Sequence, residues 1–385
     1  MKITYVLLGA ALPAALFATT AGGPIGHAAV PSTNTVDNST APQQNCQRCH
    51  NSFPVNSPGG FVRIDAFHYR PGQKQTIRVT VSHPEAQKWG FQLTARQARD
   101  LNAKAGTFSN VTGVRLRCSD TAAGRDVTPE QPCSSDALEF AGHNPQIVFG
   151  GENGTKTFEV EWTAPVNDVG DVVFYAVGNA ANSTTGNQGD RIYLDNLTVE
   201  AEGRSCPNTA RPVLQSVTNA ASNTRELSWN SLVTVWGRDF TLGTKRTASR
   251  ADMRPGYPLE LGCVAVEVAG RRVPITYVGQ DQINIQIPTV SATGSVPVRV
   301  ILNPDRPNQL VSEVGNINLQ SYAPAFFTFN GRSAAAVNNA TGALVAAPAV
   351  VSSGQPARPG DVLQLYATGL GATDPVWQAG ELPGR

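Results

Sequence analysis

One short stretch of the chain, NCQRCHNSFPVN at residues 45–56, has residue types and a spacing that could do chemistry. Cys46, Cys49 and His50 spell C-x-x-C-H, the pattern that attaches c-type haem. In that chemistry the two thiols bond the porphyrin and the histidine ligates the iron. The motif therefore suggests one hypothesis for the whole chain, an exported electron-transfer protein that carries a single haem c.

A mono-haem cytochrome also needs a helical pocket and a second axial ligand, usually Met or His. Of the two methionines, Met1 would be lost with the leader and Met253 lies far along the chain. Candidate distal ligands are His83 and His143, with His68 as a further histidine of the same region. Because the surrounding sequence predicts strands and no helical pocket, we expect no cofactor, and haem c is kept as the alternative.

Two other hypotheses account for the same residues. In the structural one, Cys46 and Cys49 form a short-loop disulfide, or one of them bridges to Cys118 or Cys133, and His50 is a polar neighbour. In the third, both thiols and His50 hold a metal ion together with one more histidine. All three hypotheses stay open at the level of the sequence.

The other four cysteines favour a disulfide framework, because six cysteines in an exported chain meet an oxidising compartment. Sequence alone does not choose among the pairings, and four cysteines still pair evenly if haem takes the first two. Cys118 and Cys133 flank a polar loop that contains Pro and Gly, which predicts a disulfide closing it. Cys206 and Cys263 are then paired by elimination.

Catalytic patterns are missing from the sequence: it has no G-x-S-x-G, no H-E-x-x-H and no phosphate-binding glycine loop. We therefore expect no catalytic residues and no enzyme. One loop, residues 178–190, is rich in oxygen ligands that could hold calcium. These are Asn179, Asn182, Asn187 and Asp190, with Asp195 nearby. Only two of them carry charge, and Asn/Gly clusters are ordinary turn chemistry, so we do not expect calcium.

Residues 1–29 have the features of a secretory signal peptide: a lysine, a short apolar run, and small residues near Ala28 and Ala29, where we expect cleavage. No later segment approaches the roughly 18 apolar residues of a spanning helix. The prediction is a secreted protein without a transmembrane segment, extracellular or at the cell surface, with the periplasm as an alternative.

Composition narrows the class of protein further. Charged residues make up 15% of the chain, against roughly 25% in ordinary soluble domains. The chain has 36 glycines and 27 prolines, which favours many turns over long helices. Its net charge is +1, so no nucleic-acid partner is expected.

The elements that must position the motif are predicted to be strands. Residues 30–45 are polar and without periodicity, which predicts a flexible lead-in. Several later segments alternate apolar and polar residues or form apolar runs, as strands do: 75–83, 157–165, 171–182 and 190–202. The third of these is the most apolar and is predicted to be a central strand. The one helical candidate is 94–106. Together they predict an antiparallel β-sandwich.

A linker at 203–212 leads to a second β region. Its predicted strands lie at 230–240, 262–288 and 294–302, and the second of these segments contains a hairpin whose turn holds Gly270. A third region begins near residue 322.

Ordered blocks in the first half resemble a known family. The blocks are CQRCHNSFPVNSPGG, YRPGQKQTIRVTVSHPEAQKWGFQLTA, AGTF, WTAPVNDVGDVVFYAVGNAAN and GDRIYL. They make residues 46–203 similar to the bacterial relatives of the reelin N-terminal (reeler) domain, also called choice-of-anchor V. The resemblance implies an antiparallel β-sandwich with an extracellular, non-catalytic role.

The second half resembles the Ig-like C-terminal modules of large exported bacterial proteins, which are similar to IPT/TIG domains. The resemblance rests on VTNAAS, LVTVWGRDF, VAVEVAGRRVPITYVGQDQINIQIP and RPGDVLQLYATGLGATDP. It implies an Ig-like module at residues 204–322 and the start of a second Ig-like unit at 323–385.

Two stretches of the second half echo each other, NSLVTVWGRDFTLG and PGDVLQLYATGLGA. The first is followed by the strand QINIQIP, whereas no such strand follows the second before Arg385. We therefore expect the second Ig-like unit to be incomplete, with residues 362–367 poorly packed unless residues 325–350 cover them.

The sequence as a whole predicts an exported all-β protein, a reeler-like sandwich followed by Ig-like modules, that acts by binding, adhesion or scaffolding. Its partner would be an unidentified extracellular protein or glycan. The alternative is the exported haem c electron carrier with its haem at residues 46–50.

Overall fold

The computed structural model describes residues 28, 46–109, 111–121, 125–128, 131–144, 148, 150–182, 186–207, 210–253, 256–289 and 293–382. Apart from Ala28, the predicted signal peptide and the lead-in at 30–45 lie outside the described residues and stay predictions. No helix in the described part is long and apolar enough to cross a membrane.

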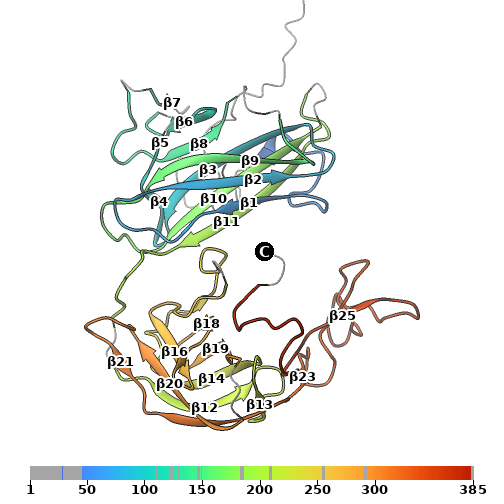
Figure 1. The fold of residues 1–385 in the computed structure, drawn as a ribbon. Helices are drawn as coiled ribbons and strands as arrows, with labels where there is room; N and C mark the ends of the chain where they lie inside the picture. Colours follow the sequence, from blue (N-terminus) through green and yellow to red (C-terminus); the bar gives the residue numbers. More distant parts are fainter. Residues whose placement is uncertain are drawn as a thin grey trace, which may run out of the picture. The chain divides into compact units, whose positions relative to one another are not determined.

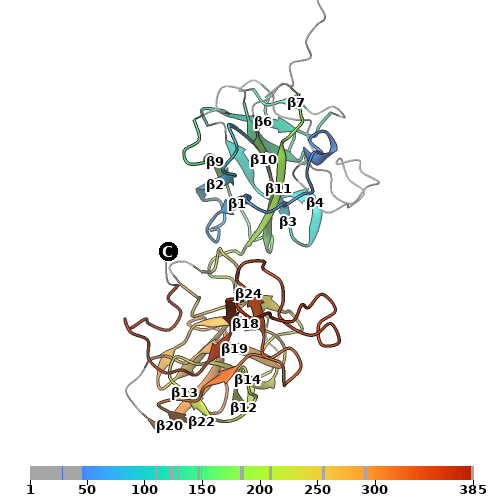
Figure 2. The same cartoon turned by 90° about the vertical axis from the view of Figure 1, so that its right-hand side faces the viewer.

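The chain divides into two compact units, residues 1–202 and 203–385 (Figures 1 and 2). The sequence placed the end of the first domain at residue 203. Local pairing explains why the division falls here. The Glu202 amide donates to the Tyr69 carbonyl at 2.8 Å and belongs to the first unit. The Cys206 amide donates to Asn303 Oδ1 at 2.8 Å and belongs to the second.

The first unit is a sandwich of two sheets. The four-stranded sheet has the order β1 (Phe61–Asp65), β2 (Lys74–Ser82), β9 (Thr155–Thr163) and β5 (Thr107–Ser109). The seven-stranded sheet has the order β11 (Arg191–Val199), β10 (Val172–Ala181), β3 (Lys88–Gln97), β8 (Glu139–His143), β6 (Val114–Cys118) and β7 (Arg125–Asp126), and β4 (Asp100–Lys104) pairs with β3. All these pairs are antiparallel, and they confirm the predicted strands.

Aromatic side chains fill the space between the two sheets of this unit. Phe91 of β3 stacks on Phe158 of β9, with ring centroids 4.5 Å apart. Trp162 of β9 meets Phe174 of β10 edge to face at 5.0 Å. Such contacts bury large apolar areas and add specific ring–ring attraction. β10 lies between β11 and β3 in its sheet, which confirms the prediction of a central strand.

The helix predicted over residues 94–106 is wrong. The structure places β3 and β4 there, joined as a hairpin. Polar residues of this segment are buried on the outer face of β3, where Arg96 is 0% exposed. Arg96 Nε donates to Thr94 Oγ1 at 3.0 Å, and the guanidinium lies over the Phe140 ring. A strand covered on both faces loses the alternation by which strands are recognised.

The second unit also has two sheets that share one core. One has the order β12 (Val213–Asn219), β14 (Leu232–Arg238), β19 (Gln282–Gln286), β18 (Ile275–Val278) and β15 (Arg246–Thr247). The other has β13 (Leu227–Ser228), β22 (Gly315–Gln320), β20 (Gly294–Leu302), β16 (Val264–Val268) and β17 (Arg271–Arg272), and β21 (Leu310–Val311) pairs with β20. The strands predicted at 230–240, 262–288 and 294–302 are confirmed.

Valine and isoleucine side chains from both sheets form the core of this unit, among them Val233 and Val235 of β14 and Val266 of β16. The predicted hairpin is present between β16 and β17. Its turn residue Gly270 has φ 74°, a left-handed conformation that glycine adopts without steric cost.

Beyond this core the strands of the described residues form two short pairs. They are β23 (Ala325–Phe326) with β26 (Ala367–Thr368), and β24 (Ala336–Asn338) with β25 (Leu363–Leu365). The poor packing expected at residues 362–367 is present: Val362 is 69% exposed, Leu365 50% and Tyr366 45%. Residues 336–338 pair with β25 but do not bury it.

Candidate functional site

The C-x-x-C-H segment forms a single helical turn, the 3₁₀ helix Cys46–Arg48. The amides of Cys49 and His50 both donate to the Cys46 carbonyl, at 3.2 and 2.9 Å. These two bonds hold Cys49 and His50 directly after the turn that begins at Cys46.

His50 is held by a buried carboxylate from a distant part of the chain. Its Nδ1 lies 2.7 Å from Oδ2 of Asp190, whose side chain is 4% exposed, against 28% for His50. Oδ1 of Asp190 accepts the Asn182 amide at 3.3 Å, and Asn179 Nδ2 lies 3.4 Å from the same His50 nitrogen. Because an ionised carboxylate only accepts hydrogen bonds, we assign the imidazole proton to Nδ1. This leaves the Nε2 lone pair available as a ligand.

The chain after the motif is fixed to the β10–β11 hairpin. Ser52 Oγ accepts the Gly189 amide at 2.7 Å. Asn56 is bonded twice to β11: its amide donates to the Ile192 carbonyl at 2.9 Å, and its Oδ1 accepts the Leu194 amide at 2.8 Å. Asn187 Nδ2 donates to the Cys49 carbonyl. The motif is thus seated on the sandwich over the end of one hairpin.

Cys46 and Cys49 carry free thiols in the structure, Cys49 on the exposed surface and Cys46 partly covered. Burial, together with the neighbouring Cys49, raises the pKa of Cys46 to about 12. The hypothesis of a bridge from this motif to Cys118 or Cys133 is wrong, because those two cysteines pair with each other. The second predicted pair, Cys206–Cys263, is also present.

The three histidines considered as distal ligands each have a different environment. His83 is 4% exposed; its Nδ1 accepts the Glu85 amide at 3.2 Å and its ring stacks on Tyr193. His143 Nδ1 accepts the Phe91 amide at 3.0 Å, and His68 Nδ1 accepts the Glu200 amide at 3.0 Å. No three His, Cys, Asp or Glu side chains of the described residues gather into a metal site. In the described part of the chain, Cys46, Cys49 and His50 are therefore not placed to hold a metal ion together.

The oxygen-rich loop examined for calcium has other bonds in its described part. Asp190 bonds to His50, and Asp195 Oδ2 accepts the Ile64 amide at 2.8 Å, which ties β11 to β1. From the sequence, Asp190 was named only as a possible calcium ligand, and its contact with His50 was not predicted. The only local signal was an aspartate at the start of a strand after a glycine-rich turn.

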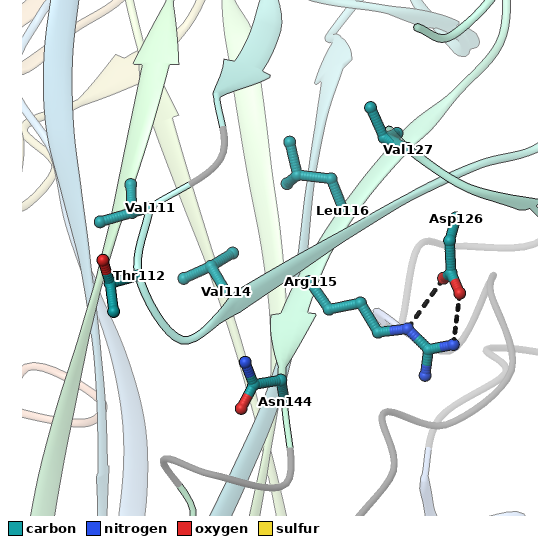
Figure 3. Close-up of a pocket in the computed structure, with 8 residues that line it drawn as sticks. All are labelled: Val111, Thr112, Val114, Arg115, Leu116, Asp126, Val127 and Asn144. Atoms are coloured by element: carbon teal, nitrogen blue, oxygen red, sulfur yellow. Dashed lines mark hydrogen bonds and ion pairs between the residues drawn. The ribbon is translucent and has the colours of Figure 1, made fainter. Parts of the chain in front are cut away.

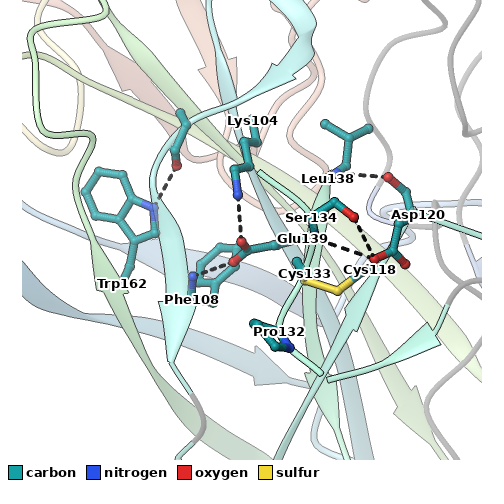
Figure 4. A network of polar contacts seen from close by, with 12 residues as sticks. Lys104, Phe108, Cys118, Asp120, Pro132, Cys133, Ser134, Leu138, Glu139 and Trp162 are labelled. Carbon is teal, nitrogen blue, oxygen red and sulfur yellow. Dashed lines mark hydrogen bonds and ion pairs between the residues drawn. A yellow bond between two sulfur atoms is a disulfide. The ribbon is translucent and has the colours of Figure 1, made fainter. Parts of the chain in front are cut away.

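A second polar network lies around the Cys118–Cys133 disulfide (Figure 4). Glu139 is 8% exposed; it accepts Lys104 Nζ at 3.0 Å through Oε1 and the Phe108 amide at 2.7 Å through Oε2. Trp162 Nε1 donates to the Ala105 carbonyl at 2.9 Å. Each of these buried polar groups has a hydrogen-bond partner, as buried groups require. The network is typical of a structural role.

A pocket of about 480 Å³ lies along β6 (Figure 3). Its lining residues are Val111, Thr112, Val114, Arg115, Leu116, Asp126, Val127 and Asn144. Arg115 binds Asp126 through two bonds of 2.8 and 2.6 Å. This pairing lowers the pKa of Asp126, mainly through the hydrogen bond. Since the two charges of the lining neutralise each other, the pocket offers a ligand no net charge.

A different feature of the second unit is its exposed apolar side chains after residue 321. Those more than half exposed are Tyr322, Phe326, Val362, Leu370 and Val376. Leu363, Leu365, Tyr366 and Trp377 are exposed by 36–50%. We call the segment 322–377 with these side chains the C-terminal apolar surface. Single exposed apolar residues are ordinary, whereas their number within this one segment makes it a candidate interaction surface.

No protein-family model matches the sequence, and no curated protein matches it. Among solved structures, two fragments of the reeler domain of human F-spondin are similar to this chain. One is 18% identical with a TM-score of 0.23 and covers 37% of this chain and 93% of its own. The other is 19% identical with a TM-score of 0.24 and covers 39% and 92%. A further structure, the Reelin-N domain of F-spondin, has 19% identity and a TM-score of 0.24, with coverage of 39% and 90%.

Identities and TM-scores at this level carry no argument about function. The all-β fold rests on the strands, registers and cores described above. The assignment of the second half to Ig-like modules stays a prediction from the sequence.

Proposed function

We propose that this chain is an exported, non-catalytic binding protein with an adhesion or scaffold role at the cell surface or in the extracellular space. The C-terminal apolar surface carries the proposal, because apolar side chains left in water favour association with a partner. Two disulfides support an oxidising compartment.

The partner we propose is an extended polypeptide segment with apolar side chains at alternate positions. The sequence echo makes Leu363 and Leu365 of β25 the counterparts of Val233 and Val235 of β14. β14 has a strand on each side, β12 and β19, and its valines are 0% exposed. β25 pairs with β24, and no described strand lies along its other edge. An edge of this kind accepts a further strand through backbone hydrogen bonds.

The test uses a labelled peptide with the sequence of residues 281–288, DQINIQIP, which includes β19. We expect the full chain to bind it, as measured by fluorescence anisotropy, and to gain hydrogen-exchange protection at 362–367. A scrambled peptide is the control for sequence, and the double variant Leu363→Ser, Leu365→Ser should lose binding. If the chain ignores the peptide but binds oligosaccharides on a glycan array, the partner is a glycan and the strand proposal is wrong.

A further inference from the structure

The contact between His50 and Asp190 changes how the C-x-x-C-H motif is interpreted. A disulfide between Cys46 and Cys49 would need only the two thiols and gives no reason for a buried carboxylate to hold the adjacent imidazole. For a ligating histidine, such a partner has a known role. Metal-binding histidines commonly donate their second ring N–H to a carboxylate, which fixes the tautomer and the ring orientation and strengthens the donor nitrogen. Asp190 stands in that relation to His50, at 2.7 Å.

The remaining geometry of the motif agrees with haem attachment. Two backbone bonds to the Cys46 carbonyl hold Cys49 and His50 next to the turn that begins at Cys46, and the two thiols remain free while the other four cysteines are paired. Haem c does not require the thiols to converge on the metal, since they bond the rim of the porphyrin and only the histidine reaches the iron. Cys49 is exposed, and Cys46 and His50 are each partly exposed at the surface.

We propose that Cys46, Cys49 and His50 form an attachment site for one covalent haem c, with Asp190 as the positioning residue for His50. This goes beyond the binding role proposed above and is independent of it. Each thiol adds across one vinyl group of haem: a carbon–sulfur bond forms at the carbon next to the ring, and the thiol hydrogen moves to the outer carbon. The addition consumes no oxidant or reductant. His50 binds the iron through Nε2, and Nδ1–H stays on Asp190.

The experiment expresses the full chain, with its leader, in a host that carries the c-type maturation machinery. A known c-type cytochrome is expressed in parallel as the positive control. We expect the mass of the denatured protein to rise by one haem, and the haem to remain with the polypeptide on a denaturing gel. The double variant Cys46→Ser, Cys49→Ser should lose both signals, whereas Thr107→Ala, on β5 of the same unit, should keep them. If the cytochrome is loaded and this chain is not, the proposal is wrong.

Asp190 is tested through the reduction potential of the loaded protein. In Asp190→Asn the acceptor oxygen remains but the charge is lost, so His50 becomes a weaker donor to the iron. We expect haem to stay attached and the potential to shift to a more positive value. Asp65→Asn, which removes a carboxylate paired with Arg63 on the surface of the same unit, should leave the potential unchanged. Equal potentials in Asp190→Asn and the parent protein would overturn the role given to Asp190.

Discussion

Several buried polar side chains of the first unit have a polar partner. Asp190 meets His50 and Glu139 meets Lys104, each from a different part of the chain, whereas Arg96 meets Thr94 on its own strand, β3. Leaving one member of such a pair without its partner costs more than the pair itself contributes, because the remaining charge stays out of water. Substitutions at such residues therefore allow the energetic cost of breaking a buried ion pair to be compared with the cost of breaking an exposed one.

Lys104→Met should destabilise the first unit by about 2 kcal/mol, since it leaves the carboxylate of Glu139 buried with only the Phe108 amide as donor. The control is Lys74→Met, which breaks the exposed pair with Glu161 and should cost less than about 1 kcal/mol. Urea unfolding of both variants gives the two free energies. Equal losses would show that the burial of Glu139 has no energetic consequence.

His83 should make stability depend on pH. Burial, and then the charge of Arg191, lower its pKa, while Glu85 acts in the opposite direction; Tyr193 packs on the ring. Because the unfolded chain then binds the proton more tightly, stability is full above the unfolded pKa of about 6.5 and falls as pH decreases through it.

The measurement for His83 is the free energy of unfolding between pH 7.5 and pH 5, compared with the variant His83→Gln. The variant should show a smaller loss on acidification. A loss identical to that of the parent protein would assign the pH dependence to other groups.

At the level of elements, the same type of strand has two outcomes in the second unit. β14 is enclosed by neighbouring strands and by the facing sheet, whereas β25 has one partner strand and exposed side chains. Local sequence is similar in the two, so the difference comes from what surrounds them. Apolar side chains stabilise a fold only when other groups remove them from water.

Matched substitutions in the two strands measure this difference. Val235→Thr should cost about 1–3 kcal/mol, because it buries a hydroxyl in an apolar core. Leu365→Thr should change the free energy of unfolding by less than about 0.5 kcal/mol, since Leu365 is 50% exposed. Thermal or urea unfolding of the two variants provides the comparison. A large loss in Leu365→Thr would mean that β25 is packed in solution.

The loop between Cys118 and Cys133 is a second element whose stability can be measured. Its disulfide closes a separation of 15 residues, and removing it with Cys118→Ala, Cys133→Ala should cost about 3 kcal/mol in the chain-entropy account. The cost should appear as a lower urea midpoint. Adding reductant to a variant that lacks Cys206–Cys263 but keeps Cys118–Cys133 should lower the midpoint by the same amount. An unchanged midpoint would contradict the role of this bridge.

At the level of the whole molecule, each of the two disulfides lies within one unit. Neither of them joins the unit that ends at residue 202 to the unit that begins at residue 203. Each unit also has its own apolar core. Two cores that share no disulfide are expected to unfold as separate cooperative units.

A specific protease site inserted between Glu202 and Gly203 tests this expectation. After cleavage, a denaturing gel without reductant should show two fragments, and each purified fragment should keep a cooperative thermal transition. A single fragment without reductant would reveal a disulfide between the units. Loss of the transition in either fragment would show that the unit depends on the other.

Much of the fold could be predicted from local sequence. Strand alternation at residues 75–83, the turn at Gly270 and the disulfide across the Cys118–Cys133 loop depend on residues close together in the chain, so their signals are local. The helix over 94–106 failed because both faces of β3 are covered, and burial of Arg96 depends on strands that the local pattern does not contain.

The candidate site, like the fold, could be predicted from the sequence only in part. Sequence alone determined the C-x-x-C-H spacing, and with it the chemistries that Cys46, Cys49 and His50 could perform. Only the tertiary structure decided what holds the imidazole. Asp190 lies 140 residues from His50 and reaches it because the β10–β11 hairpin brings the start of β11 beneath the motif. A contact of that sequence separation depends on the folded arrangement of the whole sandwich, so no local pattern of residues could specify it.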